Sequence, residues 1–264
     1  MIRFPIVKSL SIENYELFPK SLTAPFIIDI EPGPNAILGV NGSGKTTLIT
    51  LAFRCLTGPY NLPTATSVAE LGQVRPRIVS MPRYDRQLFA RRVSDGAQKA
   101  SATLKISLGA AEIEIRRKIS DLSLISYSIS GMLEGAQPSV ASQADNDDHD
   151  DENLYQTTIA RCMQVASFFD ALIILHFLVF LLEDRRALVW DPTAQRQIFR
   201  VLLLPADRAT EYAIAQQEVV SADSAVRNTS ALIYRHRNQT EIRLRQQRGM
   251  LAESEMPKPN GAFL

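Results

Sequence analysis

The chain has 264 residues, and 45% of them are hydrophobic, which is enough for one large domain or two small ones with a proper core. A net charge of +1 gives no overall attraction to nucleic acid or to any other charged partner. The two cysteines, Cys55 and Cys162, match neither a disulfide framework nor a metal-binding spacing. We therefore expect two buried, inert thiols in the reducing environment of the cytoplasm.

The first residues alternate like a strand and do not resemble a signal peptide. The most apolar run, Phe168 to Leu182, is shorter than the roughly 20 apolar residues that a membrane helix needs. This run is predicted to be a buried core helix or strand. We expect a cytoplasmic protein without a membrane partner.

Three strands are predicted before the first helix. Ile6 to Tyr15 alternates, with Leu10 and Ile12 on one face, and residues 26–30 form a second β-rich run. The short apolar run Asn35 to Leu38 follows a turn rich in proline and glycine, which predicts a buried third strand.

The stretch from Gly39 to Thr47 matches G-x-x-x-x-G-K-[ST], the phosphate-binding loop. Its glycines allow a tight curl of the backbone, which aims successive N–H groups at an anion. Residues 46–56 then read as a helix that ends at Gly58, and the N-terminus of that helix adds partial positive charge. We expect Lys45 to contact the β- and γ-phosphates and the Thr46 hydroxyl to ligate Mg²⁺. The predicted nucleotide-binding residues are Asn41, Gly42, Ser43, Gly44, Lys45, Thr46 and Thr47.

The segment from Pro59 to Arg92 is predicted to be irregular and is rich in arginine. Arg83, Tyr84 and Arg86 place an aromatic ring between cations, an arrangement that suits contact with a nucleic-acid backbone. A solvated loop with local ion pairs explains the same residues equally well, so both interpretations stay open. The arginines of the segment are Arg75, Arg77, Arg83, Arg86, Arg91 and Arg92.

Three alternating runs between Ser101 and Ser130 predict a half-buried antiparallel β-meander. Residues 131–153 are predicted to be a loop. Its second half, Asp145 to Glu152, is densely acidic, and because consecutive carboxylates repel one another we expect a disordered surface segment.

The last part of the chain is predicted to be helical. Pro192 suits the first turn of a helix that continues to Leu203, and residues 210–250 contain no proline and a single glycine. A heptad repeat predicts the seam of a coiled coil, formed by Tyr212, Val219, Val226 and Ile233. One long amphipathic helix packed on the domain is the alternative.

The order of these elements resembles the N-terminal half of an SMC/Rad50/RecF-type ATPase head. The resemblance rests on residues 7–15, which are like the opening strand of that family, and on residues 35–47, where Asn41 to Lys45 read Asn-Gly-Ser-Gly-Lys. It implies an α/β fold of the P-loop NTPase class, an ABC-ATPase-like head, with residues 1–205 in the head and 206–264 starting a coiled-coil arm. Residues 182–205 are similar to SMC-like ATPases, including those of bacterial anti-phage defence.

The family places a signature motif, a Walker B acidic pair and a switch histidine in a C-terminal half, and none of them is recognisable in this sequence. Glu183 falls where the family has its Q-loop, so it is a weak candidate for a Mg²⁺ ligand and for catalysis. A structural salt bridge to Arg185 or Arg186 explains Glu183 equally well. The chain is therefore interpreted as a fragment or an N-terminal half.

The resemblance implies binding of ATP and Mg²⁺, pairing with a second head or a C-terminal half, homodimerisation, and ATP-dependent action on DNA in repair, chromosome maintenance or phage defence. Hydrolysis is expected only when the missing motifs are supplied. Two alternatives remain: a self-sufficient P-loop NTPase that uses Glu183 and Asp184 as its Walker B pair, and a non-catalytic coiled-coil interaction module.

Overall fold

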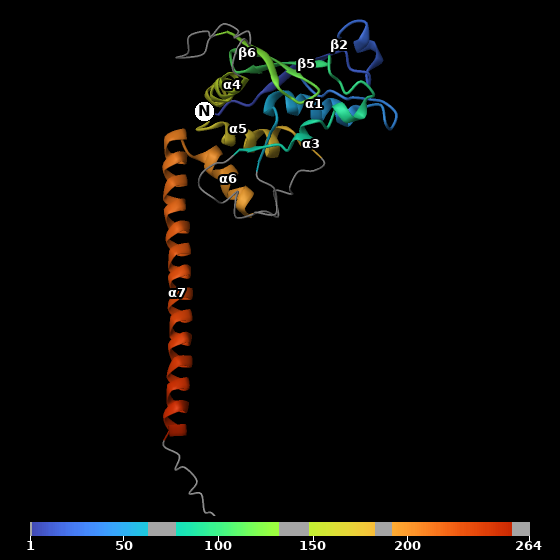
Figure 1. Ribbon diagram of the computed structural model, residues 1–264. Coiled ribbons are helices and arrows are strands. Elements are labelled where there is room, and N and C mark those ends of the chain that lie inside the picture. The colour runs from blue at the N-terminus through green and yellow to red at the C-terminus, as the bar shows by residue number, and fades with distance from the viewer. Residues whose placement is uncertain (1, 63–77, 132–147, 183–191, 255–264) are drawn as a thin grey trace, which may run out of the picture. The chain divides into compact units, whose positions relative to one another are not determined.

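The computed structural model describes residues 2–62, 78–131, 148–182 and 192–254 (Figure 1). The chain divides into two units, residues 1–214 and residues 215–264. The first unit holds the predicted sheet and its helices. The second consists, in its described part, of one long helix.

The first unit is built on a five-stranded antiparallel sheet with the strand order β2-β1-β5-β6-β7. On one face, Leu10 pairs with Leu104, which pairs in turn with Ile115, and all three side chains are buried. The opposite face carries an exposed ion pair of Lys105 with Glu114. This one-sided burial confirms the predicted meander and the first two strands. The strands are β1 (Ile6–Glu13), β2 (Phe26–Asp29), β5 (Ser101–Leu108), β6 (Ala111–Lys118) and β7 (Leu124–Ser130).

Helix α1 (Lys45–Thr57) packs against β5 and β6 and places its apolar face in the core. Both cysteines are buried, as predicted, and one of them lies on α1. The apolar run from Phe168 is helical up to Val179 and largely buried, as expected, and forms α5 (Phe168–Ile174) and a π-helical turn (Leu175–Val179). Helix α4 (Asp148–Met163) precedes it, and α6 (Pro192–Leu203) follows.

The arginine-rich segment is more regular than predicted. It contains a two-stranded ladder and two short helical turns, although residues 63–77, with Arg75 and Arg77, lie outside the described ranges. The elements are β3 (Tyr60–Asn61), β4 (Val79–Ser80), α3 (Arg83–Arg86) and the 3-10 turn η3 (Ala90–Arg92); a further 3-10 turn, η1 (Pro19–Leu22), lies between β1 and β2.

The described helices include none that is both long and apolar enough to cross a membrane by itself. The helix pair Asp151–Met163 and Phe168–Val179 reaches that length and composition only when taken together, and it is bent by 60°.

The predicted strand Asn35–Leu38 is wrong. Residues 35–40 have no regular secondary structure, and Leu38 and Val40 are 90% and 80% exposed. A strand needs a neighbouring strand to accept its backbone hydrogen bonds. In the described part of the chain, no strand pairs with this run.

The prediction of a disordered surface loop is wrong for the described part of the acidic run, while residues 145–147 lie outside the described ranges. Helix α4 begins at Asp148, and Glu152 is buried rather than part of a surface loop. Its carboxylate accepts two hydrogen bonds from the guanidinium of Arg117, at 2.8 and 2.9 Å. Because a buried carboxylate is tolerated only when it is paired, this bidentate contact explains why an acid occupies the core.

Helix α7 runs from Ala206 to Ser254. Within the second unit, Val219, Val226 and Ile233 are 68%, 64% and 63% exposed. The helix that the sequence predicts is therefore confirmed, and these three heptad residues are exposed. The coiled coil itself stays a prediction.

Candidate nucleotide-binding site

The glycine-rich loop has the backbone that its sequence requires. Gly42 and Gly44 have φ angles of 85° and 89°, in the left-handed region that favours glycine. A turn closes where the Ser43 N–H donates to the carbonyl of Val40 at 3.2 Å. Gly44 is the N-cap of α1, so the free N–H groups of the first helical turn lie directly after the loop.

Lys45 folds back over the loop. Its Nζ donates hydrogen bonds to the carbonyls of Gly39, at 2.7 Å, and Val40, at 2.9 Å. These two acceptors hold the ammonium group beside the curl of the loop, where a phosphate is expected. The loop and the start of α1 thus bring together a cation, a helix N-terminus and backbone N–H groups, an arrangement that suits an anion.

The two threonines after the lysine differ in environment. Thr46 is exposed, and its role as a Mg²⁺ ligand stays a prediction. Thr47 is buried, and its hydroxyl oxygen accepts a hydrogen bond of 2.6 Å from Nη1 of Arg92. The structure therefore adds an arginine to the loop that no motif identified.

The loop rests on residues from the beginning of the chain. A Cβ atom on Gly44 would lie 3.0 Å from the ring of Phe18, and that ring stacks on Phe26 at 5.2 Å between centroids. Tyr15 is fully buried, and its hydroxyl donates to the carbonyl of Phe89 at 3.0 Å. The last residue of the opening strand motif, Tyr15, thus supports the segment that carries Arg92, and Phe18, three residues later, supports the loop.

The hydroxyl of Tyr15 also interacts electrostatically with Arg92, the arginine beside the loop. Burial raises the pKa of its hydroxyl, and the nearby guanidinium of Arg92 opposes that rise. The phenol is neutral at physiological pH and acts here as a hydrogen-bond donor.

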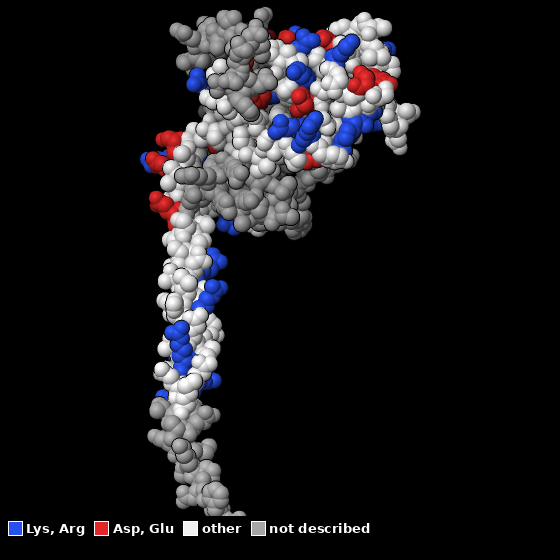
Figure 2. Space-filling model, viewed as in Figure 1, with Lys and Arg blue, Asp and Glu red and all other residues white. Residues whose placement is uncertain are grey.

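A basic surface formed by Arg83, Tyr84, Arg86 and Arg91 lies on the segment after α1 (Figure 2). Tyr84 is 67% exposed, and the guanidinium of Arg91 lies 3.4 Å from the centroid of its ring. Nε of Arg86 donates to the carbonyl of Met81 at 2.8 Å, which fixes that side chain. A polar cavity of about 520 Å³ adjoins this surface, and Arg83 and Arg86 are among its lining residues. This surface combines cations with an exposed tyrosine whose ring is covered on one side by Arg91.

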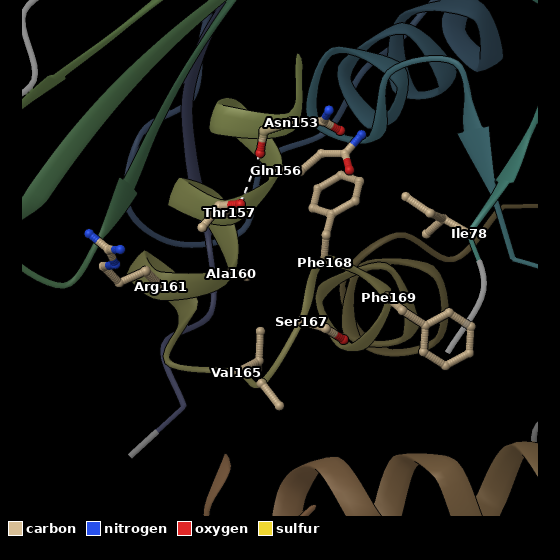
Figure 3. A pocket seen from close by; sticks show the side chains of 11 residues that line it. Ile78, Asn153, Gln156, Thr157, Ala160, Arg161, Val165, Ser167, Phe168 and Phe169 are labelled. Atoms are coloured by element: carbon tan, nitrogen blue, oxygen red, sulfur yellow. Dashed lines mark hydrogen bonds between the residues drawn. The ribbon is translucent and has the colours of Figure 1, made fainter. Parts of the chain in front are cut away.

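A second cavity, of about 720 Å³, lies between α4 and α5 (Figure 3). In Figure 3 the carboxamide groups of Asn153 and Gln156 lie near the edge of the Phe168 ring, at one end of the cavity. Phe168 packs edge-on against Tyr60, which follows the C-terminal end of α1. The cavity is therefore a feature of the opposite end of α1 from the loop.

Glu183, the catalytic and metal candidate, lies outside the described residues together with Asp184. Among the residues that are described, no three histidine, cysteine, aspartate or glutamate side chains gather into a metal site. Thr46 is thus the predicted Mg²⁺ ligand whose position the structure gives.

Arg92 is the residue of the loop region that sequence reasoning missed. It was one of six arginines in a basic segment, and neither periodicity nor a motif separates it from the others. Only the fold brings it to Thr47, 45 residues earlier in the chain.

A family model described as an AAA domain matches residues 9–196, which is more than half of the chain and includes the loop, the meander and α4 to α6. A search of curated proteins found no match.

Proposed function

The chain belongs to the SMC/Rad50-type AAA family, and from that premise we propose that it is the ATP-binding half of a head that acts on DNA. The family is one of ATPases that generally bind ATP with Mg²⁺ and usually act with DNA as dimers. The observation that carries the proposal is the loop itself: two left-handed glycines, the Lys45 ammonium and the start of α1 converge on one point.

Calorimetry tests the binding step directly. Titration with a non-hydrolysable ATP analogue in the presence of Mg²⁺ is expected to give a saturable heat for the wild-type chain. Lys45→Ala removes a charged donor to the phosphates and should weaken binding about 10- to 100-fold. Equal affinity for the wild type and this variant contradicts the proposal and favours the non-catalytic interaction module.

We propose that hydrolysis needs a second polypeptide or a C-terminal half. The apolar run before the loop supports this, because Ile37, Leu38 and Val40 are 41%, 90% and 80% exposed in a backbone without a partner strand in the described ranges. Added strands on this run would bury those side chains and complete a sheet around the loop. The chain alone should bind nucleotide without sustained turnover. Release of several phosphates per second by the purified chain argues instead for a self-sufficient enzyme that uses Glu183.

DNA is the proposed partner of the basic surface. Arg83, Tyr84 and Arg91 offer phosphate contacts and a ring for base stacking, and the chain as a whole is nearly neutral, so any attraction must be local. Fluorescence anisotropy with a labelled oligonucleotide should show binding that weakens as salt rises. Tyr84→Ala should reduce it several-fold, whereas Tyr234→Ala on α7 should not. Unchanged binding by Tyr84→Ala contradicts this placement.

We further propose that α7 starts a coiled-coil arm and supports a homodimer. Its evenly spaced exposed residues Val219, Val226 and Ile233 suit a seam against a second helix. Light scattering should show a larger mass for the wild type than for a variant with serine at these three positions. Equal monomeric masses count against a homodimer.

A further inference from the structure

The basic surface formed by Arg83, Tyr84, Arg86 and Arg91 lies beside a polar cavity of about 520 Å³. Resting on the proposed binding of DNA at this surface, we propose that the surface selects single-stranded DNA. One base stacks on the outer face of Tyr84. Another unpaired base of the same strand enters the cavity, where Asp121 accepts a hydrogen bond from an amino group of that base.

The helical segment of residues 83–92 presents the cavity and the tyrosine ring on neighbouring sides. Its turns follow one another, because the N–H of Gln87 donates to the carbonyl of Arg83 at 3.3 Å and the N–H of Arg91 donates to the carbonyl of Gln87 at 3.1 Å. Helical residues three, four and seven apart share a face. Tyr84 and Arg91 share one face, about 100° around the axis from the face that lines the cavity. The cavity face consists of Arg83, Arg86, Gln87 and Ala90.

The ring of Tyr84 has one covered face and one open face. The guanidinium of Arg91 lies 3.4 Å from the ring centroid and covers the first face. Because Tyr84 is 67% exposed, the other face is open to solvent. A base can stack there only if its own face is free, which is the case in a single strand and not inside a duplex.

The far wall of the cavity is polar and carries no cation. Gln98 comes from the segment before β5, and Ser120 and Asp121 come from the turn between β6 and β7. Carboxamide and hydroxyl groups offer both donors and acceptors, as the edges of bases do. In a duplex the pairing edge of a base is occupied by its partner, so this wall can read only an unpaired base. The volume of the cavity is in the range of pockets that hold small ligands.

Arg83 and Arg86 supply positive charge for the phosphates that flank such a base. Nε of Arg86 donates to the carbonyl of Met81 at 2.8 Å, and its Nη2 donates to the hydroxyl of Ser80, so this side chain is held in place. Among the described residues, no carboxylate lies within ion-pair distance of either arginine. Both charges are therefore available to a nucleic-acid backbone.

Asp121 indicates which bases fit the cavity. Its Oδ1 accepts the N–H of Ser123 at 3.0 Å and the hydroxyl of Ser123 at 2.8 Å, which fixes the carboxylate, and Oδ2 takes part in neither bond. A carboxylate repels phosphate and accepts from an exocyclic amino group such as N4 of cytosine. Thymine has no amino group, and carbonyl oxygens flank its single imino N–H. Cytosine should therefore bind better than thymine.

The first test compares a single strand with the duplex of the same sequence and length by fluorescence anisotropy. The wild-type chain should bind the single strand about tenfold more tightly, because the duplex offers phosphates without free base faces. Tyr84→Ala should lower the affinity for the single strand to that for the duplex and leave duplex binding unchanged. Arg83→Ala should weaken both forms by a similar factor, because it removes a phosphate contact.

The second test compares oligo(dC) with oligo(dT) at slightly alkaline pH, where cytosine is not protonated. The wild type should prefer oligo(dC) several-fold. Asp121→Asn keeps an oxygen acceptor for Ser123 and replaces the other oxygen with a donor, so this preference should disappear or reverse. A surface that acts only through charge predicts instead that Asp121→Asn tightens both oligonucleotides equally.

Asp29→Asn is the matched control. It removes the same charge from an exposed position on β2, at the other edge of the sheet, and should leave the ratio of the two affinities unchanged. Circular dichroism confirms that each variant is folded. Equal wild-type affinities for single strand and duplex, or a ratio that Asp121→Asn does not alter, overturn the inference while DNA binding stands. A wild-type chain that binds neither form overturns DNA as the partner of this surface.

Discussion

The two ends of α1 satisfy their backbone groups in opposite ways. At the N-terminal end, Lys45 and Arg92 stand beside free helix N–H groups, and no described carboxylate pairs with either cation. At the C-terminal end, the carbonyl of Cys55 accepts Nε of Arg117 at 2.9 Å, and that of Leu56 accepts the hydroxyl of Tyr155 at 2.6 Å.

This difference indicates that the N-terminal end of α1 is the end suited to a ligand. A helix carries partial positive charge at its start and partial negative charge at its end. The protein neutralises the negative end internally, with a buried arginine and the carboxylate of Glu152 as its counter-ion. The positive end stays accessible and carries two further cations, Lys45 and Arg92. This arrangement favours the binding of an anion. A phosphate group would complete this end as Glu152 completes the other.

Breaking the buried pair should have the largest effect on stability. Glu152→Gln leaves the charge of Arg117 in the core without its counter-ion, which should lower the free energy of unfolding by about 3–5 kcal/mol. Urea denaturation measures this loss. Glu211→Gln is the control, because it removes an exposed carboxylate paired with Arg208 and should cost at most about 1 kcal/mol. Similar losses in both variants contradict the comparison.

The second largest effect on stability is expected at Gly58, at the C-terminal end of α1. Gly58 has φ 60° and ψ −151°, a conformation essentially restricted to glycine. A Cβ atom there would also lie 2.9 Å from the guanidinium of Arg117. Gly58→Ala should therefore cost about 1–3 kcal/mol or more, measured by urea denaturation. Gly96 has φ 64° but only an ordinary contact of 3.5 Å, so Gly96→Ala should lower the free energy of unfolding less. A larger loss for Gly96→Ala than for Gly58→Ala would contradict the close packing of Arg117 against the C-terminal end of α1.

Cys55, near the C-terminal end of α1, should make the free energy of unfolding depend on pH. Burial raises the pKa of its thiol from 9.0 to about 12, so above pH 9 the unfolded chain loses a proton that the folded chain keeps. The free energy of unfolding should then fall with pH between about 9 and 12, by up to about 1.4 kcal/mol per pH unit from this group. Denaturation over this range should show a shallower fall for Cys55→Ala. An equal fall of the free energy of unfolding with pH in the wild type and in Cys55→Ala would contradict a raised pKa of the thiol.

The open end should show the smallest change. The hydrogen bonds that Lys45 makes to described residues go to two exposed loop carbonyls, so Lys45→Ala should change the free energy of unfolding by no more than about 0.5 kcal/mol, although it should weaken nucleotide binding. Thermal unfolding without nucleotide measures this. A loss comparable to that of Glu152→Gln would mean that the lysine is structural.

Local patterns in the sequence predicted the elements that depend on near neighbours. The glycines of the loop, the apolar face of α1, the alternation of the meander and the uninterrupted α7 all follow from backbone preference and periodicity, and the structure confirms them. The predicted strand 35–38 failed because strand formation requires a partner, which no local pattern supplies.

What the sequence determined by itself is the phosphate-binding loop and the class of fold around it, because a short motif with its flanking elements fixes that backbone. What only the tertiary structure decided is which charged residues matter. Arg117 and Glu152 meet across 35 residues, and Arg92 reaches Thr47 across 45. The physical reason is that charge pairing depends on distance in space and on burial, and neither quantity is written in the order of residues along the chain.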